Sequence, residues 1–192
     1  MGLIFCAYTE SMFSKIIHTP YGLSPDDIKQ ICFIDGHVKK GRRDVVQSWH
    51  KSVELATKKI STSKSNYTPN LSKRIGRFID NYIKGPSQIR NKIAHGQWHT
   101  ALNSNNTAVN EQLTQKVSTL TIVDLYRNRE AFDSLARILE DIIESPNKAH
   151  WKDFWDHMSI YEEKQKEMKS WTLEGKIKRL KEKKEFYKIY NQ

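Results

Sequence analysis

Residues 121–146 read TIVDLYRNREAFDSLARILEDIIESP and form a long amphipathic segment. Thr121 is a favourable helix cap, and Asp124, three residues later, completes a capping box. Pro146 cannot continue a helix, so it marks the end of the segment. Between these signals, large apolar side chains recur at helical spacing: Leu125, Phe132, Leu135, Ile138, Leu139 and Ile142. The pattern predicts a long helix with one buried face, which is a main structural element of the protein.

Shorter amphipathic segments precede this helix. Their apolar spacing predicts helices over residues 3–17, about 25–33, about 42–60 and 71–83. Asp35-Gly36-His37 is expected to break the chain after the second of these helices. Gly85-Pro86-Ser87 is expected to close one helix and open the next, because Gly tolerates a left-handed cap and Pro suits a first helical turn. Residues 101–115, rich in Asn, Ser and Thr, predict a mobile loop or a short irregular hairpin.

The predicted fold class is therefore all-α. Residues 1–145 are expected to form a helical bundle, and residues 146–192 a basic helical extension that contains aromatic residues. A chain of 192 residues is long enough for one core, and a hydrophobic share of 38% indicates a modest one. The formal net charge of +10 favours a polyanionic partner, although an anionic membrane surface would satisfy the same charge.

The cysteines and the N-terminus indicate a cytoplasmic protein. Cys6 and Cys32 form no CxxC pattern and are expected to be reduced. The first residues lack a positive segment, and Glu10 soon interrupts their short apolar run, so neither a signal peptide nor a membrane-spanning helix is predicted.

Residues 90–96, RNKIAHG, carry the strongest chemical signal. The Arg90 guanidinium is always charged and binds phosphate oxygens, whereas the His95 imidazole can take or give a proton near neutral pH. Asn91 and His95 are four residues apart and share a helix face, so the Asn91 amide is placed to orient the ring.

Arg90 and His95 are five residues apart, roughly 140° around the helix axis. Cleavage of RNA through its own 2′-hydroxyl needs both a base and an acid. One histidine supplies only one of them, which predicts a two-fold dimer with facing motif helices.

Arg90-Asn91-Lys92-Ile93-Ala94-His95 resembles the Arg-polar-x-x-x-His signature of the HEPN superfamily of helical ribonucleases. The resemblance implies a HEPN-like helical bundle and a dimeric, metal-independent endoribonuclease that leaves a 2′,3′-cyclic phosphate. It also implies a role as a toxin or antiviral defence effector. An antitoxin or an activator protein would be the partner that controls it. By this resemblance Arg90 stabilises the transition state, Asn91 supports it, and His95 does acid–base work. HEPN toxins silenced by a nucleotidyltransferase carry a tyrosine two residues after the histidine, where this chain has Gln97, so that control is not expected here.

Further basic and aromatic residues are candidates for RNA binding. Lys73, Arg74 and Arg77 are predicted on the outer face of the 71–83 helix, and Lys92 lies within the motif. Trp98 is placed either to pack against the core or a partner subunit, or to stack on a base. His95 and His99 are four residues apart, but no further ligand stands at recognisable spacing, so neither a metal nor another cofactor is predicted.

The extension and the function each leave alternatives. Trp151, Phe154, Trp155 and Met158 precede a lysine-rich run that ends in residues 186–190, FYKIY. Such a segment can grip single-stranded RNA, but the favoured interpretation is a helix that docks its aromatic side chains on the core or on a partner. For the whole chain, the alternative to a nuclease is a non-catalytic helical module that binds RNA, a nucleotide or another protein. A third possibility is a membrane-surface protein that uses the lysine-rich tail.

Overall fold

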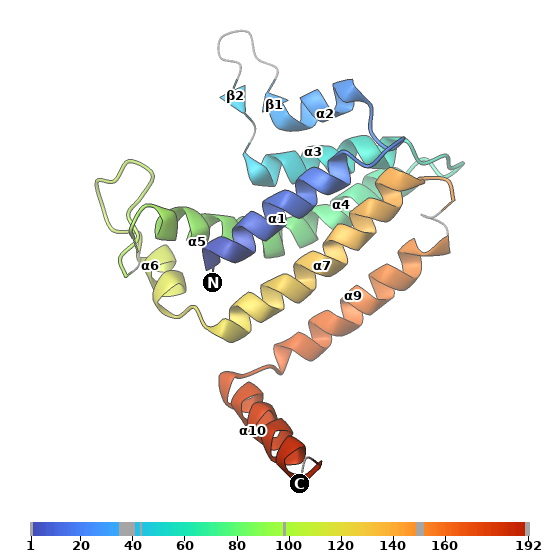
Figure 1. Ribbon diagram of the computed structural model, residues 1–192. Helices are drawn as coiled ribbons and strands as arrows, with labels where there is room; N and C mark the ends of the chain where they lie inside the picture. The colour runs from blue at the N-terminus through green and yellow to red at the C-terminus, as the bar shows by residue number, and fades with distance from the viewer. Residues whose placement is uncertain (1, 35–40, 43, 98, 149–151, 191–192) are drawn as a thin grey trace.

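The computed structural model describes residues 2–34, 41–42, 44–97, 99–148 and 152–190. Over these ranges the chain is mostly helical, as the sequence predicts (Figure 1). Two two-residue strands, β1 (Phe33–Ile34) and β2 (Gly41–Arg42), form an antiparallel pair. The predicted break at Asp35-Gly36-His37 lies outside the described residues. The helices are α1 (Gly2–Ile17), α2 (Pro25–Cys32), α3 (Val45–Lys58), α4 (Tyr67–Ile79), η1 (Asp80–Lys84), α5 (Gly85–Ala94), α6 (Glu111–Ser118), α7 (Ile122–Glu144), α9 (Phe154–Lys169) and α10 (Leu173–Tyr190).

Helix α7 is the central element, and its caps match the sequence. The Asp124 backbone N–H donates to the Thr121 hydroxyl at 3.3 Å, and the Thr121 N–H donates to the Asp124 carboxylate at 2.9 Å. The helix ends at Glu144, before Pro146. Its apolar face is buried along most of its length and contacts α1, α3, α4 and α9. The predicted main helix is confirmed.

Aromatic rings tie the helices into one core. The Trp49 ring of α3 lies 4.6 Å from the Phe13 ring of α1 and 5.6 Å from the Phe132 ring of α7, measured between centroids. Helix α9 runs beside α7 (Figure 1) and buries Phe154, Met158, Tyr161 and Met168 in the same core. The first part of the extension therefore docks on the bundle, as the favoured interpretation expected. Helix α10 projects from the bundle and leaves Leu173, Ile177 and Leu180 exposed.

The expected boundary at Gly85-Pro86-Ser87 is correct for the start of the motif helix, since α5 begins at Gly85 with Pro86 in its first turn, but the expected left-handed cap and break do not occur at Gly85. The chain stays helical from α4 through η1 into α5, and Gly85 has helical angles of φ −59° and ψ −57°. In a regular α-helix, Pro86 would have no N–H to donate to the carbonyl of Tyr82, and its ring would crowd that oxygen. The π-helical turn η1 directly precedes it and widens the helix there, which removes the conflict without ending the helix.

The expected loop over residues 101–115 is correct only in its first half. Leu102 and Val109 form an isolated antiparallel bridge, in agreement with a short irregular hairpin. Helix α6 then begins at Glu111, capped by the Asn110 side chain, which accepts a hydrogen bond from the Leu113 N–H at 3.0 Å. This two-turn helix has one buried residue, Val117, too weak an apolar pattern to stand out in the sequence.

Within the described ranges, no helix combines the length and the apolar character that crossing a bilayer requires.

Replacing the cap of α7 should destabilise the fold measurably. Thr121→Ala is expected to lower the free energy of unfolding by about 1 kcal/mol in urea denaturation at pH 7. The exposed Thr100→Ala is the control and should change it by less than about 0.5 kcal/mol. Burial opposes ionisation of Asp124, but the Thr121 hydroxyl and N–H and Arg127 outweigh it and lower the pKa of the Asp124 carboxyl. The cap's contribution is therefore present above the ordinary Asp pKa and lost as pH falls through the lowered one. A Thr121→Ala deficit that grows in acid would contradict this account.

Candidate functional site

The motif helix α5 ends in a left-handed glycine cap. Gly96 has φ +74°, its N–H donates to the Ile93 carbonyl at 3.1 Å, and the Gln97 N–H donates to the Lys92 carbonyl at 2.8 Å. These two bonds form a Schellman motif, which a glycine at this position favours. His95 is thereby held as the C-cap residue directly after the helix, with its side chain exposed.

His95 and Asn91 both face a polar hollow of about 840 Å³ between α5, the hairpin and α6. Both side chains are exposed, and no hydrogen bond joins them among the described residues. The expected orientation of the ring by Asn91 is therefore not made in this structure. The polar hollow is lined by Gln88, Asn91, Lys92, His95, Gln97, Leu102, Asn103, Ser104, Asn106, Asn110, Gln112, Leu113 and Lys116.

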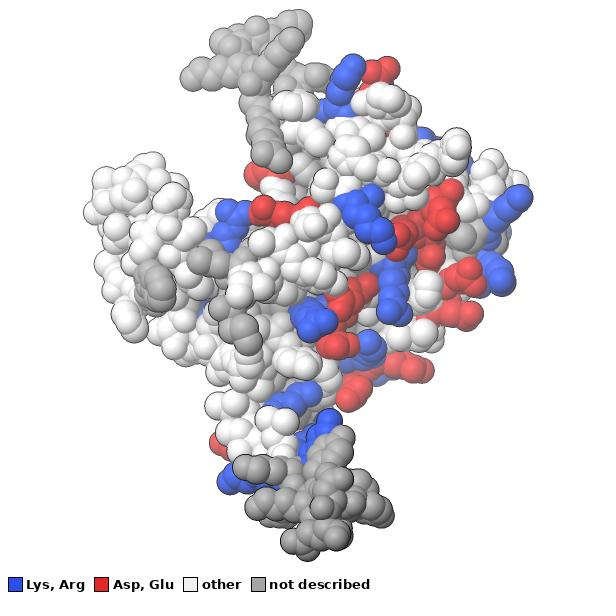
Figure 2. Space-filling model, viewed as in Figure 1, with Lys and Arg blue, Asp and Glu red and all other residues white. Residues whose placement is uncertain are grey.

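Every residue that lines the polar hollow is either positively charged or neutral. Lys92, Lys116 and His95 are its ionisable groups, and the lining includes no Asp or Glu. On the face shown in Figure 2, acidic and basic side chains alternate over α7 and α9, whereas few charged side chains are visible over the hairpin and α6. Over the described ranges, no three His, Cys, Asp or Glu side chains are grouped as metal ligands. Binding in the hollow would thus depend on hydrogen bonds with a small positive bias.

Arg90 lies on a different side of α5. Its guanidinium is ion-paired with Glu10 of α1, and it lines a narrow hollow beside Trp49 and Tyr82 rather than the polar hollow of His95. Burial raises the pKa of the Tyr82 hydroxyl, so this neighbour is neutral at physiological pH. The separation agrees with the roughly 140° that five helical residues impose. One subunit therefore does not gather the motif into a single pocket.

The hairpin is held against α5 by the motif's own neighbours. The Lys92 ammonium donates to the Leu102 carbonyl at 2.6 Å, and the Gln97 side-chain oxygen accepts from the Leu102 N–H at 2.8 Å. One residue earlier, the Ala101 N–H donates to the Thr114 hydroxyl of α6 at 2.9 Å. Lys92, a candidate for RNA binding, thus also has a structural role.

The other candidate RNA-binding residues lie away from the polar hollow. Arg74 is ion-paired with Glu162 of α9 and lies 6.0 Å from the centre of the Trp155 ring. Lys73 and Arg77 are exposed on α4. None of these three lines the hollow, and Trp98 lies outside the described residues.

Helix α6, which forms one wall of the polar hollow, is not predicted from the sequence. Gln112 and Lys116 are four residues apart and face it from α6, opposite Gln88 and His95 on α5. The capping Asn110 followed by Glu111 was the signal available in the sequence. It was outweighed by the run of Asn, Ser and Thr before it.

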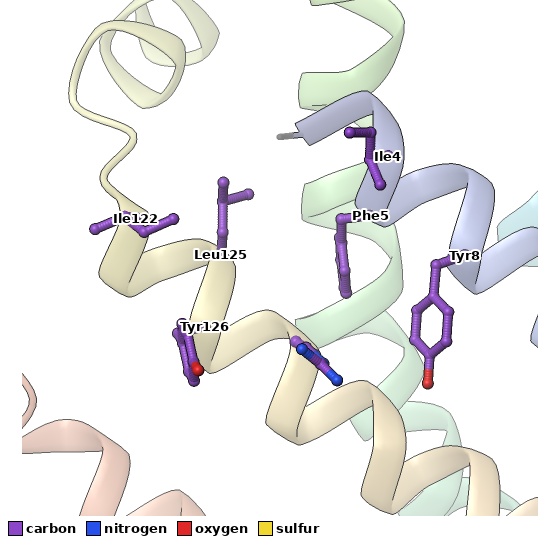
Figure 3. Close-up of a pocket in the computed structure, with 7 residues that line it drawn as sticks. Ile4, Phe5, Tyr8, Ile122, Leu125 and Tyr126 are labelled. Atoms are coloured by element: carbon purple, nitrogen blue, oxygen red, sulfur yellow. The ribbon is translucent and has the colours of Figure 1, made fainter.

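A second surface next to the motif helix is apolar. Ile4, Phe5 and Tyr8 of α1 face Ile122, Leu125 and Tyr126 of α7 across a hollow of about 340 Å³ (Figure 3). A smaller hollow shares Phe5 and Leu125 with it and continues to Ile89 and Ile93 of α5. We call this continuous surface the apolar trough. Ile4 is 71% exposed, Ile122 43% and Tyr126 49%, and α5 has no buried residue.

Comparisons of the chain with protein-family models, with curated proteins and with solved structures give no match.

Loss of the Gln97 side chain should release the hairpin locally. In Gln97→Ala, the Leu102 amide loses its acceptor, and its hydrogen exchange should accelerate roughly fivefold, as expected for a net contribution of about 1 kcal/mol. The Asn103 amide donates to the Ala108 carbonyl at 2.8 Å and serves as the internal control, with little change expected. Equal acceleration at both amides would show that Gln97 supports the whole hairpin instead. Exchange rates from NMR measure both.

Proposed function

We propose that this protein is a metal-independent endoribonuclease of the HEPN type that acts as a two-fold dimer. The observation that carries the proposal is the placement of His95: an exposed imidazole at the end of α5, facing a hollow without carboxylates. Such a hollow accepts a phosphodiester without repelling it.

The proposed reaction needs one base and one acid. His95 of one subunit takes the proton of the 2′-hydroxyl, the freed oxygen attacks the phosphorus, and the 5′-oxygen leaves with a proton from the second His95. The product ends are a 2′,3′-cyclic phosphate and a 5′-hydroxyl. Each proton transfer contributes about 10²–10⁴ in rate. Arg90 neutralises the charge that develops on the phosphate, and Asn91 supports the site through a hydrogen bond.

The apolar trough supports the dimer. It runs along α5, and a helix with no buried residue and neighbours such as Ile4 left in water is typical of a surface that a second chain covers. A second copy bound there with two-fold symmetry would bring both motif helices to one interface. Arg90 lines the same trough, so a dimer formed there would carry the arginines of both subunits at its interface.

The ion pair between Arg90 and Glu10 favours a second candidate function. In this state the guanidinium is turned away from His95, as a non-catalytic RNA-binding module would permit. The two functions differ in chemistry: a binding module leaves RNA intact at any protein concentration. The role as a toxin or defence effector, with an antitoxin or activator, belongs to the nuclease proposal alone.

The His95→Ala variant tests catalysis. Purified protein incubated with total RNA in excess EDTA should cut it and leave 2′,3′-cyclic phosphate ends, whereas His95→Ala should be slower by about 10²-fold or more. His99→Ala is the matched control, since it removes an exposed imidazole four residues away and should cut normally. DNA should stay intact because it lacks the 2′-hydroxyl. RNA left whole by the unmodified protein, or cut equally by His95→Ala, would refute the assignment.

The apolar trough is tested by charge. The double variant Ile4→Asp, Ile122→Asp places two carboxylates on exposed positions, so the monomer should fold normally while a dry interface becomes unfavourable. Sedimentation should give twice the 22.5 kDa chain mass for the unmodified protein and a single chain for the variant, with RNA cleavage lost. Leu180→Asp, on the exposed face of α10, is the control and should remain dimeric. A variant that stays dimeric would place the interface elsewhere.

A further inference from the structure

We infer that the polar hollow binds an unpaired nucleotide of the RNA and recognises its base through the side-chain amides of Gln88 and Gln112. Lys116 contacts a neighbouring phosphate. The inference rests on the proposed function, because it assigns the substrate position next to His95, and it adds a base preference to the cleavage.

Two helix faces form opposite walls of the hollow. Gln88, Asn91 and His95 are spaced three and four residues apart, so they form one stripe along α5. Gln112 and Lys116 form a second stripe on α6. His95 and the amides of Gln88 and Gln112 therefore face the same space from helices, which is the arrangement that fixes a bound group in one register.

The amides of the hollow divide into two groups. Those of Asn103 and Asn110 in the hairpin already accept hydrogen bonds. The Thr107 N–H donates to the Asn103 side chain at 3.0 Å, and Asn110 caps α6. Within the described part of the chain, the side chains of Gln88 and Gln112 have no hydrogen-bond partner and are exposed. The structure thus uses the hairpin amides to build the wall and leaves the helical amides available to a ligand.

An amide pair suits a base better than other ligands. A Gln side chain donates and accepts at the same time, which matches the donor and acceptor pattern of a base edge. Lys92 is engaged with the Leu102 carbonyl, so Lys116 is the lysine left to meet a phosphate. Only Leu102 and Leu113 in the lining are apolar, which argues against a lipid or hydrocarbon ligand.

The proposed base recognition requires single-stranded RNA. A base in a duplex has its pairing edge occupied, whereas an unpaired base can turn that edge toward the protein. The volume of about 840 Å³ falls within the range of small-molecule sites and accommodates a nucleotide. We therefore expect selection at the nucleotide beside the scissile bond.

The test uses RNA that cannot be cut. Fluorescence anisotropy of the full chain with 2′-O-methyl hexanucleotides of A, C or U should show one bound at least about tenfold more tightly than the weakest, the effect of a bidentate amide–base contact. Gln112→Ala and Gln88→Ala should each bring that ratio below about threefold. Lys116→Ala should weaken all three similarly and leave the ratio unchanged. Gln115→Ala, an exposed Gln on α6 that does not line the hollow, is the matched control.

The outcomes separate this inference from the nuclease proposal. Equal binding of the three oligomers, a preference that survives in both glutamine variants, or the same loss in Gln115→Ala would overturn the base recognition. Because the oligomers lack a free 2′-hydroxyl, this result does not depend on catalysis. RNA cut with no preference would leave the nuclease standing without the inference. A glutamine-dependent preference in a protein that never cuts RNA would leave the site standing without the nuclease.

Discussion

Burial of one face of α7 is the constraint on which the other packing depends. Phe132, Leu135, Ile138, Leu139 and Ile142 are fully buried, and each contributes about 1.5–3 kcal/mol relative to exposure in water. Helices α1, α3, α4 and α9 reach the core through this face. The same helix carries Leu125 beyond the core to the apolar trough. The position of α7 therefore sets both the bundle and the surface beside the motif helix.

The motif helix α5 is positioned mainly by its unbroken connection to α4 and η1, and less by burial of its own side chains. Helix α4 and η1 bury Leu71, Ile75, Ile79 and Ile83, whereas α5 buries none of its residues. Because no break separates them, the orientation of α5 follows from the packing of α4 and from the π-helical turn. That turn changes the angular phase of every residue after it. With the angular positions that result, Arg90 faces α1 and His95 faces α6. The two side chains therefore lie on different surfaces of the protein.

The predictions that the structure confirms rest on local signals, such as helix caps. The capping box of Thr121 and Asp124 acts over three residues, and it occurs where the sequence places it. Pro86 misled because the widened turn that tolerates it depends on the packing of α4, which the proline does not reveal. The partner of Arg90 was beyond prediction, since Glu10 lies 80 residues away and only the crossing of α1 and α5 brings it near. The function assigned to the motif stays a prediction.

The ion pair of Arg90 does not remove it from the proposed chemistry. Arg90 and Glu10 are 32% and 48% exposed, and an ion pair so accessible to water contributes about 0–1 kcal/mol. In the proposed nuclease, a phosphodiester at the dimer interface would offer the same guanidinium two oxygens that share one negative charge, and desolvation there would strengthen the contact. Exchange of one anion for another is therefore inexpensive. In the proposed nuclease, Glu10 would be the partner of Arg90 in the absence of RNA, and a bound phosphate would replace it.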